Sequence, residues 1–319
     1  MSHSQRNIIF GTGPIGMSVM DTLRARGYTQ IVMVNRSGKT REPLPEGVEL
    51  VRGDATDSSF STQVTQGATV IYNALNPAYS KWATDFPPMQ AGVVAAAQAN
   101  QAKLVVMDNL YMYGDTNGKP IHEGLPYIAH TRKGRLRGEM AQQLLDLHTQ
   151  GKINMVIARA SDFVGLRVHG AAMSSSVFQA ALLGKPAQVV GSLDVVHSMT
   201  YVKDVGRALV DLAEQDDTFG QVWHVPTAPA ITTRAWLEKI YAEAGQPVKT
   251  LVAGRLMLGL IGLFVKDLGE IYEMLYEFEK PFIIDSTKFE TRFGWKGTPI
   301  DEIIHRTLAW NRQNMPTTH

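Results

Sequence analysis

The sequence predicts an α/β fold in which helices cover both faces of a parallel β-sheet, and three observations support this. Short apolar runs alternate with segments of helical periodicity through the first half of the chain. The apolar runs are unbroken, as expected for strands that are buried on both faces of a sheet. After about residue 165 mostly helical patterns follow. Together these features are typical of a doubly wound parallel sheet with a smaller, mostly helical C-terminal domain.

Each expected strand is an unbroken run of apolar residues, many of them β-branched. In the first half these runs cover 7–10, 31–34, 48–51, 69–74, 104–107 and 154–158. A further run, "QVWHV" at 221–225, could return to the same sheet. The alternation therefore predicts one sheet that takes strands from both halves of the chain.

Helices are expected between and after these strands. The first, 14–26, places Ile15, Val19 and Leu23 on one stripe, and Gly27 follows where the helix should end. The other expected helices are 58–66, 87–100, 132–148, 202–215, 233–244, 255–279 and 301–313. These elements predict a sheet domain of 1–165 plus about 197–225, and a smaller substrate domain of about 166–196 plus 226–319.

The composition excludes several classes of protein. Lys and Arg number 31 against 30 Asp and Glu, which leaves a net charge of +1 and argues against a dedicated nucleic-acid binder. The absence of cysteine excludes disulfides and thiolate chemistry and is compatible with a reducing cytoplasm. His169, His197 and His224 are scattered without a second ligand at metal spacing, so no metal site is expected.

No segment looks like a signal peptide or a membrane span. The first residues, "MSHSQRNIIF", contain no long apolar stretch. The longest apolar run, "LVAGRLMLGLIGLFVKDLG", is interrupted by Arg255 and is short of the ~20 apolar residues that a span requires. A buried or interfacial helix is expected there. We therefore expect a cytoplasmic protein that acts on a small molecule and has no nucleic-acid or membrane partner. Such a protein could form an oligomer.

A glycine-rich loop follows the first strand and opens the first helix. In "IIFGTGPIG" the first glycine permits a tight turn, the second lets the backbone approach a pyrophosphate, and the third allows close packing of helix on strand. The free N–H groups of the helix N-terminus would face the phosphates. This pattern is typical of a Rossmann-type dinucleotide site. The residues expected to contact the cofactor here are Gly11, Thr12, Gly13, Pro14, Ile15 and Gly16.

The end of the second strand favours NADP over NAD. NAD sites commonly have Asp or Glu here, which bonds the ribose 2′-hydroxyl. This chain has Asn35, Arg36 and Ser37 instead. Asn35 removes a charge that would repel a 2′-phosphate, and the guanidinium of Arg36 suits a phosphate. The alternative is that Arg36 is a solvated loop residue.

Two more loops are expected at the same cleft, because ligands bind outside the carboxyl ends of such strands. Asp54 and Ala55 in "GDATD" could contact adenine, and Asp57 could cap the next helix. After the fourth strand come Asn73, Ala74 and Leu75.

With these residues in place, the chain resembles the extended short-chain dehydrogenase/reductase family, also called NAD-dependent epimerase/dehydratases. The order and spacing of several segments carry the resemblance. They are "GTGPIG", "GDATD", "LYMYGD", "IHEGLPY", "ARASDFVG", "MTYVKDVGRAL" and "DSTKFETRFGWKGTPIDEII". The resemblance implies a Rossmann sheet with a small helical substrate domain.

The resemblance also implies a reaction centre, and this chain departs from it. The family's tyrosine exchanges a proton with the substrate oxygen, a lysine four residues later binds the nicotinamide ribose, and a Ser or Thr ends strand five. Alignment with "GRLRGEM" puts Thr131 and Arg135 at the tyrosine and lysine positions, and Asn109 at the hydroxyl position. This makes the chain an atypical member. Arg135 could bond ribose but not shuttle protons, and Thr131 is a poor acid.

Another group would have to supply the proton. Tyr111 is the preferred candidate, since Tyr113 is better explained as a core residue, and His122 and Tyr127 are further options. The helix start carries four cations, of which Lys133 and Arg135 are expected to face the cofactor or an anionic substrate, and Arg132 and Arg137 the solvent. Tyr79 and Trp82 could stack on a ligand or anchor their loop.

Three functions remain open on the sequence. The first is an NADP-dependent oxidoreductase that acts on a small carbonyl or hydroxyl compound with a non-standard proton donor. The second is an epimerase or dehydratase that oxidises and re-reduces a sugar-like substrate. The third is a non-catalytic dinucleotide-binding sensor or regulator, which an intact glycine loop with a lost proton relay also fits.

Overall fold

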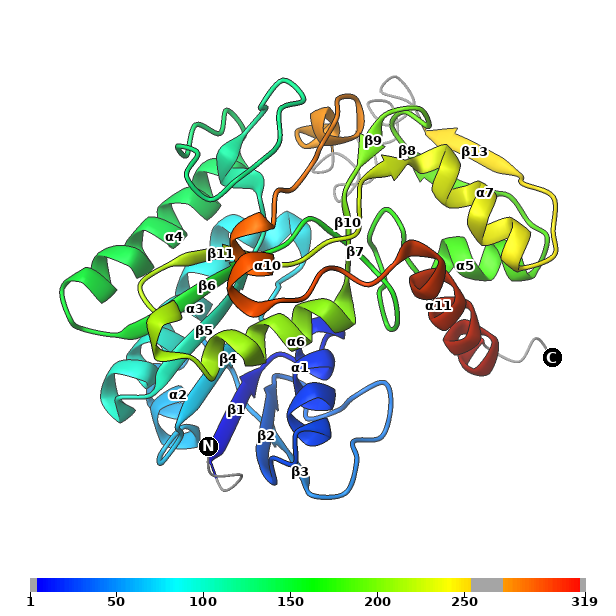
Figure 1. Ribbon diagram of the computed structural model, residues 1–319. Helices are drawn as coiled ribbons and strands as arrows, with labels where there is room; N and C mark the ends of the chain where they lie inside the picture. Colours follow the sequence, from blue (N-terminus) through cyan, green and yellow to red (C-terminus); the bar gives the residue numbers. More distant parts are fainter. Residues whose placement is uncertain (1–4, 254–271, 316–319) are drawn as a thin grey trace.

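The computed structural model describes residues 5–253 and 272–315, and in them a seven-stranded parallel sheet forms the centre of the larger part (Figure 1). The strand order is β11-β6-β5-β4-β1-β2-β3, with each neighbouring pair parallel. The strands are β1 (Arg6–Phe10), β2 (Gln30–Asn35), β3 (Val48–Arg52), β4 (Val70–Asn73), β5 (Lys103–Asp108), β6 (Asn154–Arg159) and β11 (Val222–His224). The order along the chain reverses at β1, which is where doubly wound sheets open a crevice for ligands.

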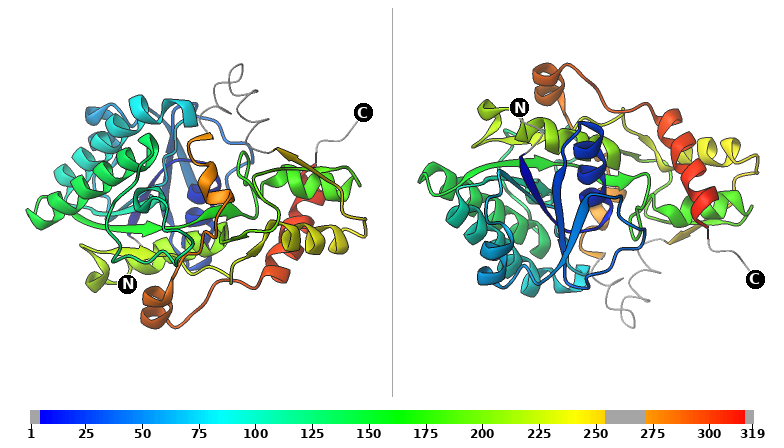
Figure 2. Two further views of the ribbon diagram at one scale, coloured as in Figure 1. Left: turned by 90° about the horizontal axis from the view of Figure 1, so that it is seen from above. Right: turned by 90° about the horizontal axis from the view of Figure 1, so that it is seen from below.

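Helices cover both faces of this sheet (Figure 2). One face carries α1 (Pro14–Ala25) and α6 (Val202–Ala213), and the other carries α2 (Ser58–Val64), α3 (Trp82–Asn100) and α4 (Arg132–Thr149). Successive strand residues point to opposite faces, so Ile9 belongs to the core under α1 whereas Ile8 and Phe10 belong to the core under α3. Burial on both faces explains why the strands read as unbroken apolar runs.

The smaller part of the molecule consists of short ladders and helices (Figure 1). β8 (Ala187–Val190) pairs with β13 (Thr250–Ala253), and β9 (Val196–His197) pairs with β12 (Ile231–Thr232). Helices α5 (Ser175–Leu182), α7 (Thr233–Glu243) and α11 (Ile300–Asn314) pack together beside them. β7 (Asp162–Val164) pairs with β10 (Met199–Tyr201). The C-terminal segment also forms η4 (Leu275–Phe278) and α10 (Thr287–Phe293), and α10 packs beside β11.

The predicted fold class is confirmed, with corrections at individual elements. α3 begins at Trp82 rather than at residue 87, because Pro87 and Pro88 lie inside the helix instead of opening it. The expected helix 255–279 lies mostly outside the described residues, and its described end contains the 3₁₀ turn η4. Over the ranges that the structure describes, no helix combines the length and the apolar character needed to cross a membrane.

The packing of α1 on α6 depends on a glycine. A Cβ atom on Gly206 of α6 would overlap the hydroxyl and main chain of Ser18 on α1. At the far end of α1, Arg26 bridges to α6 through Asp211 at 2.5 Å and to Glu214, just beyond the helix, at 2.6 Å. The two helices therefore approach closely along their length and hold one face of the sheet.

We predict that Gly206→Ala lowers the free energy of unfolding by ~1–3 kcal/mol, because the added methyl group forces α1 and α6 apart. The matched control is Gly138→Ala on α4, where the new Cβ would meet Met112 Cβ at an ordinary 3.4 Å. Alanine favours a helix interior by up to ~1 kcal/mol over glycine, so this control should be at least as stable as the wild type. Urea denaturation measures both, and equal losses would contradict the packing explanation.

Candidate active site

A cleft of about 490 Å³ lies at the carboxyl ends of the central strands. Its walls come from the segments that follow β1, β2, β3, β4, β5 and β6, together with Arg137 of α4. It brings the glycine loop together with aromatic and polar side chains from far along the sequence. This is the crevice position that ligands occupy in doubly wound sheets.

The three glycines after β1 occupy different environments. Gly11 has a φ of +108°, and a Cβ there would lie 2.6 Å from the carbonyl oxygen of Ala74. Gly16 packs against the main chain of Gly11, where a Cβ would clash. A Cβ on Gly13 meets no protein atom within 4 Å, so the backbone is open to the cleft. Gly13 also begins α1 without a side-chain cap, which leaves the first N–H groups available to an anion.

Five of the six predicted loop residues line the cleft: Gly11, Thr12, Gly13, Pro14 and Ile15. Gly16 does not, and its contact with the main chain of Gly11 gives it a packing role.

At the end of β2 the Asn35 side chain is committed to its own loop. Its Nδ2 donates to Thr12 Oγ1 at 2.7 Å and to the Lys39 carbonyl at 2.8 Å. Its Oδ1 accepts from the Gly38 N–H at 2.7 Å. Ser37 bonds within the same loop, whereas exposed Arg36 lines the cleft. Arg36 is therefore the residue here whose side chain can still turn to a ligand.

The loops after β3 and β4 contribute backbone and small side chains. Ala55, Ala74 and Leu75 line the cleft. Asp54 does not line it, since its carboxylate accepts from the Thr56 N–H at 3.0 Å, and Asp57 caps α2 as predicted. Buried Asn73 also lies behind the lining, with its Oδ1 accepting from the Leu75 N–H at 3.3 Å.

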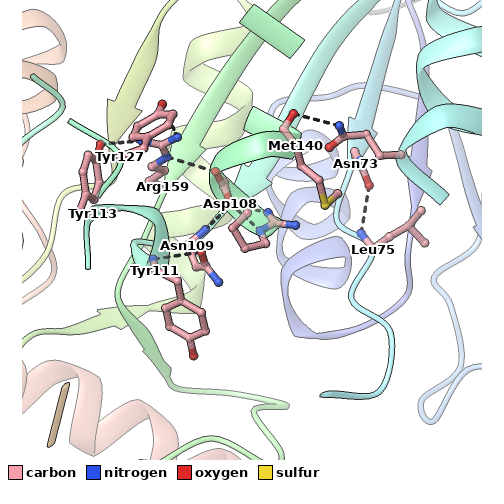
Figure 3. Close-up of polar contacts among 11 residues, drawn as sticks. Asn73, Leu75, Asp108, Asn109, Tyr111, Tyr113, Tyr127, Met140 and Arg159 are labelled. Carbon is pink, nitrogen blue, oxygen red and sulfur yellow. Dashed lines mark hydrogen bonds and ion pairs between the residues drawn. The ribbon is translucent and has the colours of Figure 1, made fainter. Parts of the chain in front are cut away.

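A buried carboxylate organises the end of β5. Asp108 Oδ1 accepts from Arg137 Nε at 2.9 Å and also from Arg137 Nη2, while Asp108 Oδ2 accepts from Arg159 Nε at 3.1 Å (Figure 3). All three side chains are at most 6% exposed. Two guanidinium groups thus share one carboxylate, and this joins β5, β6 and α4 beneath the cleft.

Tyrosines extend this network toward β11. Arg159 donates at 2.6 Å to the hydroxyls of both Tyr113 and Tyr127 (Figure 3). The Tyr113 hydroxyl therefore donates its own hydrogen to His224 Nε2, 3.0 Å away. Burial, together with the charge of Arg159, lowers the pKa of His224 to about 3, which keeps this imidazole neutral. Tyr113 is a core residue, as expected.

The two predicted strand-five candidates both line the cleft. Asn109 N–H donates to Asp108 at 2.8 Å, and Asn109 Oδ1 accepts from the Tyr111 N–H at 3.2 Å. The Asn109 amide nitrogen, a donor only, is then the group left to meet a ligand. Burial raises the pKa of Tyr111 well above its ordinary value, which makes it a weak acid.

The start of α4 has a different orientation from the one predicted. Thr131 is the N-cap, and its hydroxyl accepts from the Gly134 N–H at 3.1 Å. Arg135 is exposed, bonds the His130 carbonyl at 2.6 Å and does not line the cleft, whereas Arg137 is buried and does. This corrects the expected orientation of both arginines. The reason is that Lys133 and Arg137, one turn apart, form the inward stripe.

Lys133 is buried just behind the cleft. Its Nζ lies 3.1 Å from Glu273 Oε1 and 4.5 Å from the centre of the Tyr79 ring. Tyr79, Trp82 and Tyr111 form an aromatic wall, with Trp82 stacked on Tyr111 at 5.8 Å. The cleft is therefore apolar on this side.

Sequence analysis did not identify four candidate functional residues: Asp108, Arg137, Arg159 and Asp162. Polar residues at the ends of β5 and β6 were a visible signal, but their partners lie on other elements. Among the described residues, no group of three or more His, Asp or Glu side chains could hold a metal ion.

The fold and cleft together define a dinucleotide-binding α/β protein. A model of the NAD dependent epimerase/dehydratase family matches residues 8–225, more than half of the chain. The chain belongs to this family, which confirms the resemblance, and membership supports a nicotinamide dinucleotide as cofactor. Comparison with curated protein sequences gives no match.

Solved structures share the fold at low sequence identity. An epimerase from Methanothermobacter thermautotrophicus is 16% identical with a TM-score of 0.81, over 98% of this chain and 94% of that one. A dTDP-glucose 4,6-dehydratase from Bacillus anthracis, in complex with NAD, is 13% identical with a TM-score of 0.79, over 98% of each chain. A UDP-glucose 4-epimerase from Thermus thermophilus, also with NAD, is 19% identical with a TM-score of 0.78, over 98% of this chain and 100% of that one.

We predict that Asp108→Asn lowers the free energy of unfolding by ~3–5 kcal/mol, because it leaves two buried guanidinium groups without a carboxylate. The control is Asp194→Asn, which removes an exposed carboxylate paired with Arg234 and should cost little. Urea denaturation compares the two variants. A loss for Asp108→Asn no larger than that of the control would show that the buried network does not hold the site.

Proposed function

We propose that the protein is a nicotinamide-dependent oxidoreductase that acts on a small carbonyl or hydroxyl compound with an apolar body. The observation that carries the proposal is a single cleft that joins the open backbone at Gly13 to the polar groups of Asn109 and Arg137. When bound, a nicotinamide dinucleotide supplies or accepts a hydride at a substrate carbon. A small-molecule substrate and a cytoplasmic location, with no nucleic-acid or membrane partner, belong to the same proposal.

The residues present fit such a cofactor. The uncapped first turn of α1 would hold the diphosphate, and Ala55, Ala74 and Leu75 would flank it with small or apolar groups. Asp54 and Asn73 would support these loops from behind. The Asn109 amide would donate to the substrate oxygen. Trp82 also lines the cleft, and its buried Nε1 has no hydrogen-bond partner in the described part of the chain.

The predicted proton-transfer residues fit this role unequally. Tyr111 lines the cleft and could orient a substrate, although its raised pKa makes it a poor acid. Thr131 has its hydroxyl engaged as a helix cap, and Arg135 faces away. Arg137 contributes fixed positive charge, since a guanidinium does not release its proton.

We propose that the protein prefers NADP to NAD. The support comes from this chain, because β2 ends in Asn35 rather than in an acidic residue, and the next residue, Arg36, lines the cleft. Solved relatives in complex with NAD support the opposite preference, but they are under 20% identical to this chain.

We predict that the protein binds NADPH more tightly than NADH, and that Arg36→Ala weakens NADPH binding ~10-fold or more while NADH binding hardly changes. The reason is loss of a charge-assisted contact to the 2′-phosphate, worth ~1.5–3 kcal/mol. Calorimetry measures both affinities. Arg41→Ala, which changes a basic residue of the same connection that does not line the cleft, serves as the control. An unchanged preference in Arg36→Ala would show that Arg36 is a solvated loop residue.

The second candidate is an epimerase or dehydratase, and the comparisons support it as well, since the similar solved structures are of an epimerase, a UDP-glucose 4-epimerase and a dTDP-glucose 4,6-dehydratase. Such an enzyme returns the hydride to its substrate and consumes no net cofactor. The wall of Tyr79, Trp82 and Tyr111 offers aromatic faces together with two hydroxyls, so it suits either kind of substrate and does not separate the two candidates.

We predict that the wild type oxidises NADPH in the presence of an apolar carbonyl compound such as benzaldehyde or phenanthrenequinone. The fall in NADPH absorbance measures this oxidation. Tightly co-purified cofactor and conversion of a nucleotide sugar without net oxidation would instead establish the epimerase. Cofactor binding without turnover of either class of substrate would indicate the non-catalytic sensor.

A further inference from the structure

We propose that Asp162 is the proton donor of this cleft, and that His197 is a positioning residue that keeps one transferable proton on the pair. The inference rests on the proposed function, because it names the proton source for the same reaction. It concerns two residues outside the motif that resembles the family's reaction centre.

Asp162 occupies the required place. It is the first residue of β7, three residues after the end of β6, and it lines the cleft with Asn109 and Tyr111. Its side chain is 20% exposed, whereas that of His197 is only 2% exposed. Asp162 can therefore meet a ligand, and His197 can reach one only through Asp162.

The hydrogen bonds of His197 fix where protons must lie. Its Nδ1 lies 3.0 Å from the backbone carbonyl of Glu277, and a carbonyl can only accept, so Nδ1 carries a hydrogen. Its Nε2 lies 2.7 Å from Asp162 Oδ2. Two bare lone pairs would repel at this distance. One further proton must therefore sit between them, on the carboxyl oxygen or on the imidazole nitrogen.

The surroundings prevent the ring from turning to another arrangement. His197 stacks on Phe278, at 4.8 Å between ring centres, and on Phe282, at 5.1 Å. Its ring is buried, so water does not replace the Asp162 bond. Burial raises the pKa of the Glu277 carboxyl well above its ordinary value, which favours the neutral form of that group. Glu277 thus contributes its backbone carbonyl and no second negative charge.

The Asp162–His197 pair supplies the one proton that reduction of a carbonyl requires in addition to the hydride. With a dinucleotide bound, hydride addition to the carbonyl carbon would move the π electrons of the C=O bond to oxygen, and Asp162 would give that oxygen the proton that it shares with His197. The pair is left one proton short, with a carboxylate facing a bare Nε2. Repulsion between them favours prompt recovery of a proton from water. In the reverse direction Asp162 accepts the hydroxyl proton.

A first test looks for the stored proton without any reaction. In protein labelled with ¹⁵N-histidine and ¹³C-aspartate, NMR near neutral pH should find either Asp162 protonated or His197 Nε2 protonated. In Asp162→Asn the same histidine should become neutral, with hydrogen on Nδ1 only. An ionised Asp162 facing a bare Nε2 in the wild type would overturn the proposal, whatever the enzyme catalyses.

A second test uses turnover of phenanthrenequinone with NADPH. Asp162→Asn should lower kcat ~100-fold or more, as loss of a positioned acid does, with the affinity for NADPH unchanged. Added formate should restore part of the rate to Asp162→Ala, whose missing carboxyl leaves room for it. His197→Gln should lower kcat while leaving KM near that of the wild type. Asp194→Asn, which changes an exposed carboxylate just before β9, is the control.

The outcomes separate the two claims. An Asp162→Asn rate within threefold of the wild type overturns the proton donor while leaving the oxidoreductase intact. A wild type that turns over no carbonyl overturns the proposed function, and the NMR signals still decide whether the pair stores a proton.

Discussion

The carboxylate of Asp108 is the interaction on which the site depends. A buried carboxylate is tolerated only when its charge and its lone pairs are met, and here two guanidinium groups and the Asn109 N–H meet them. The three partners come from α4, from β6 and from the turn after β5. The orientation of the cleft wall follows from this single group, because Asn109 and Tyr111 leave β5 directly after it.

This network also limits the chemistry that α4 can supply. Arg137 enters the cleft wall already paired, and a guanidinium does not release a proton near neutral pH. It can orient or balance charge but cannot replace an acid. In our proposal the proton comes from Asp162 at the start of β7, which is paired with a histidine that stacks on aromatic rings.

The fold could be predicted from the sequence because its signals are local. Unbroken apolar runs mark strands that are buried on both faces. Gly11, Gly13 and Gly16 lie within six residues of one another, in the loop after the first strand and the start of the helix that follows. The site was harder to predict. Spacing alone shows that residues four apart share a helix face, but not which face: Thr131 with Arg135, or Lys133 with Arg137. In the structure Thr131 is the N-cap of α4, and Lys133 and Arg137 form the buried face. The Asp108–Arg159 pair, 51 residues apart, has no local signal at all.

The two halves of the site rest on separate contacts. The dinucleotide half needs the close approach of Gly11 to Ala74 and the packing of Gly16, all within the first β-strands and α1. The half proposed to carry the reaction depends on the contacts of Asp108, Asp162 and His197, which cross from β5 to the C-terminal segment. Substitutions at the start of α4 therefore leave the glycine loop undisturbed. In our proposal the cofactor crevice and the proton donor therefore depend on different elements of the fold.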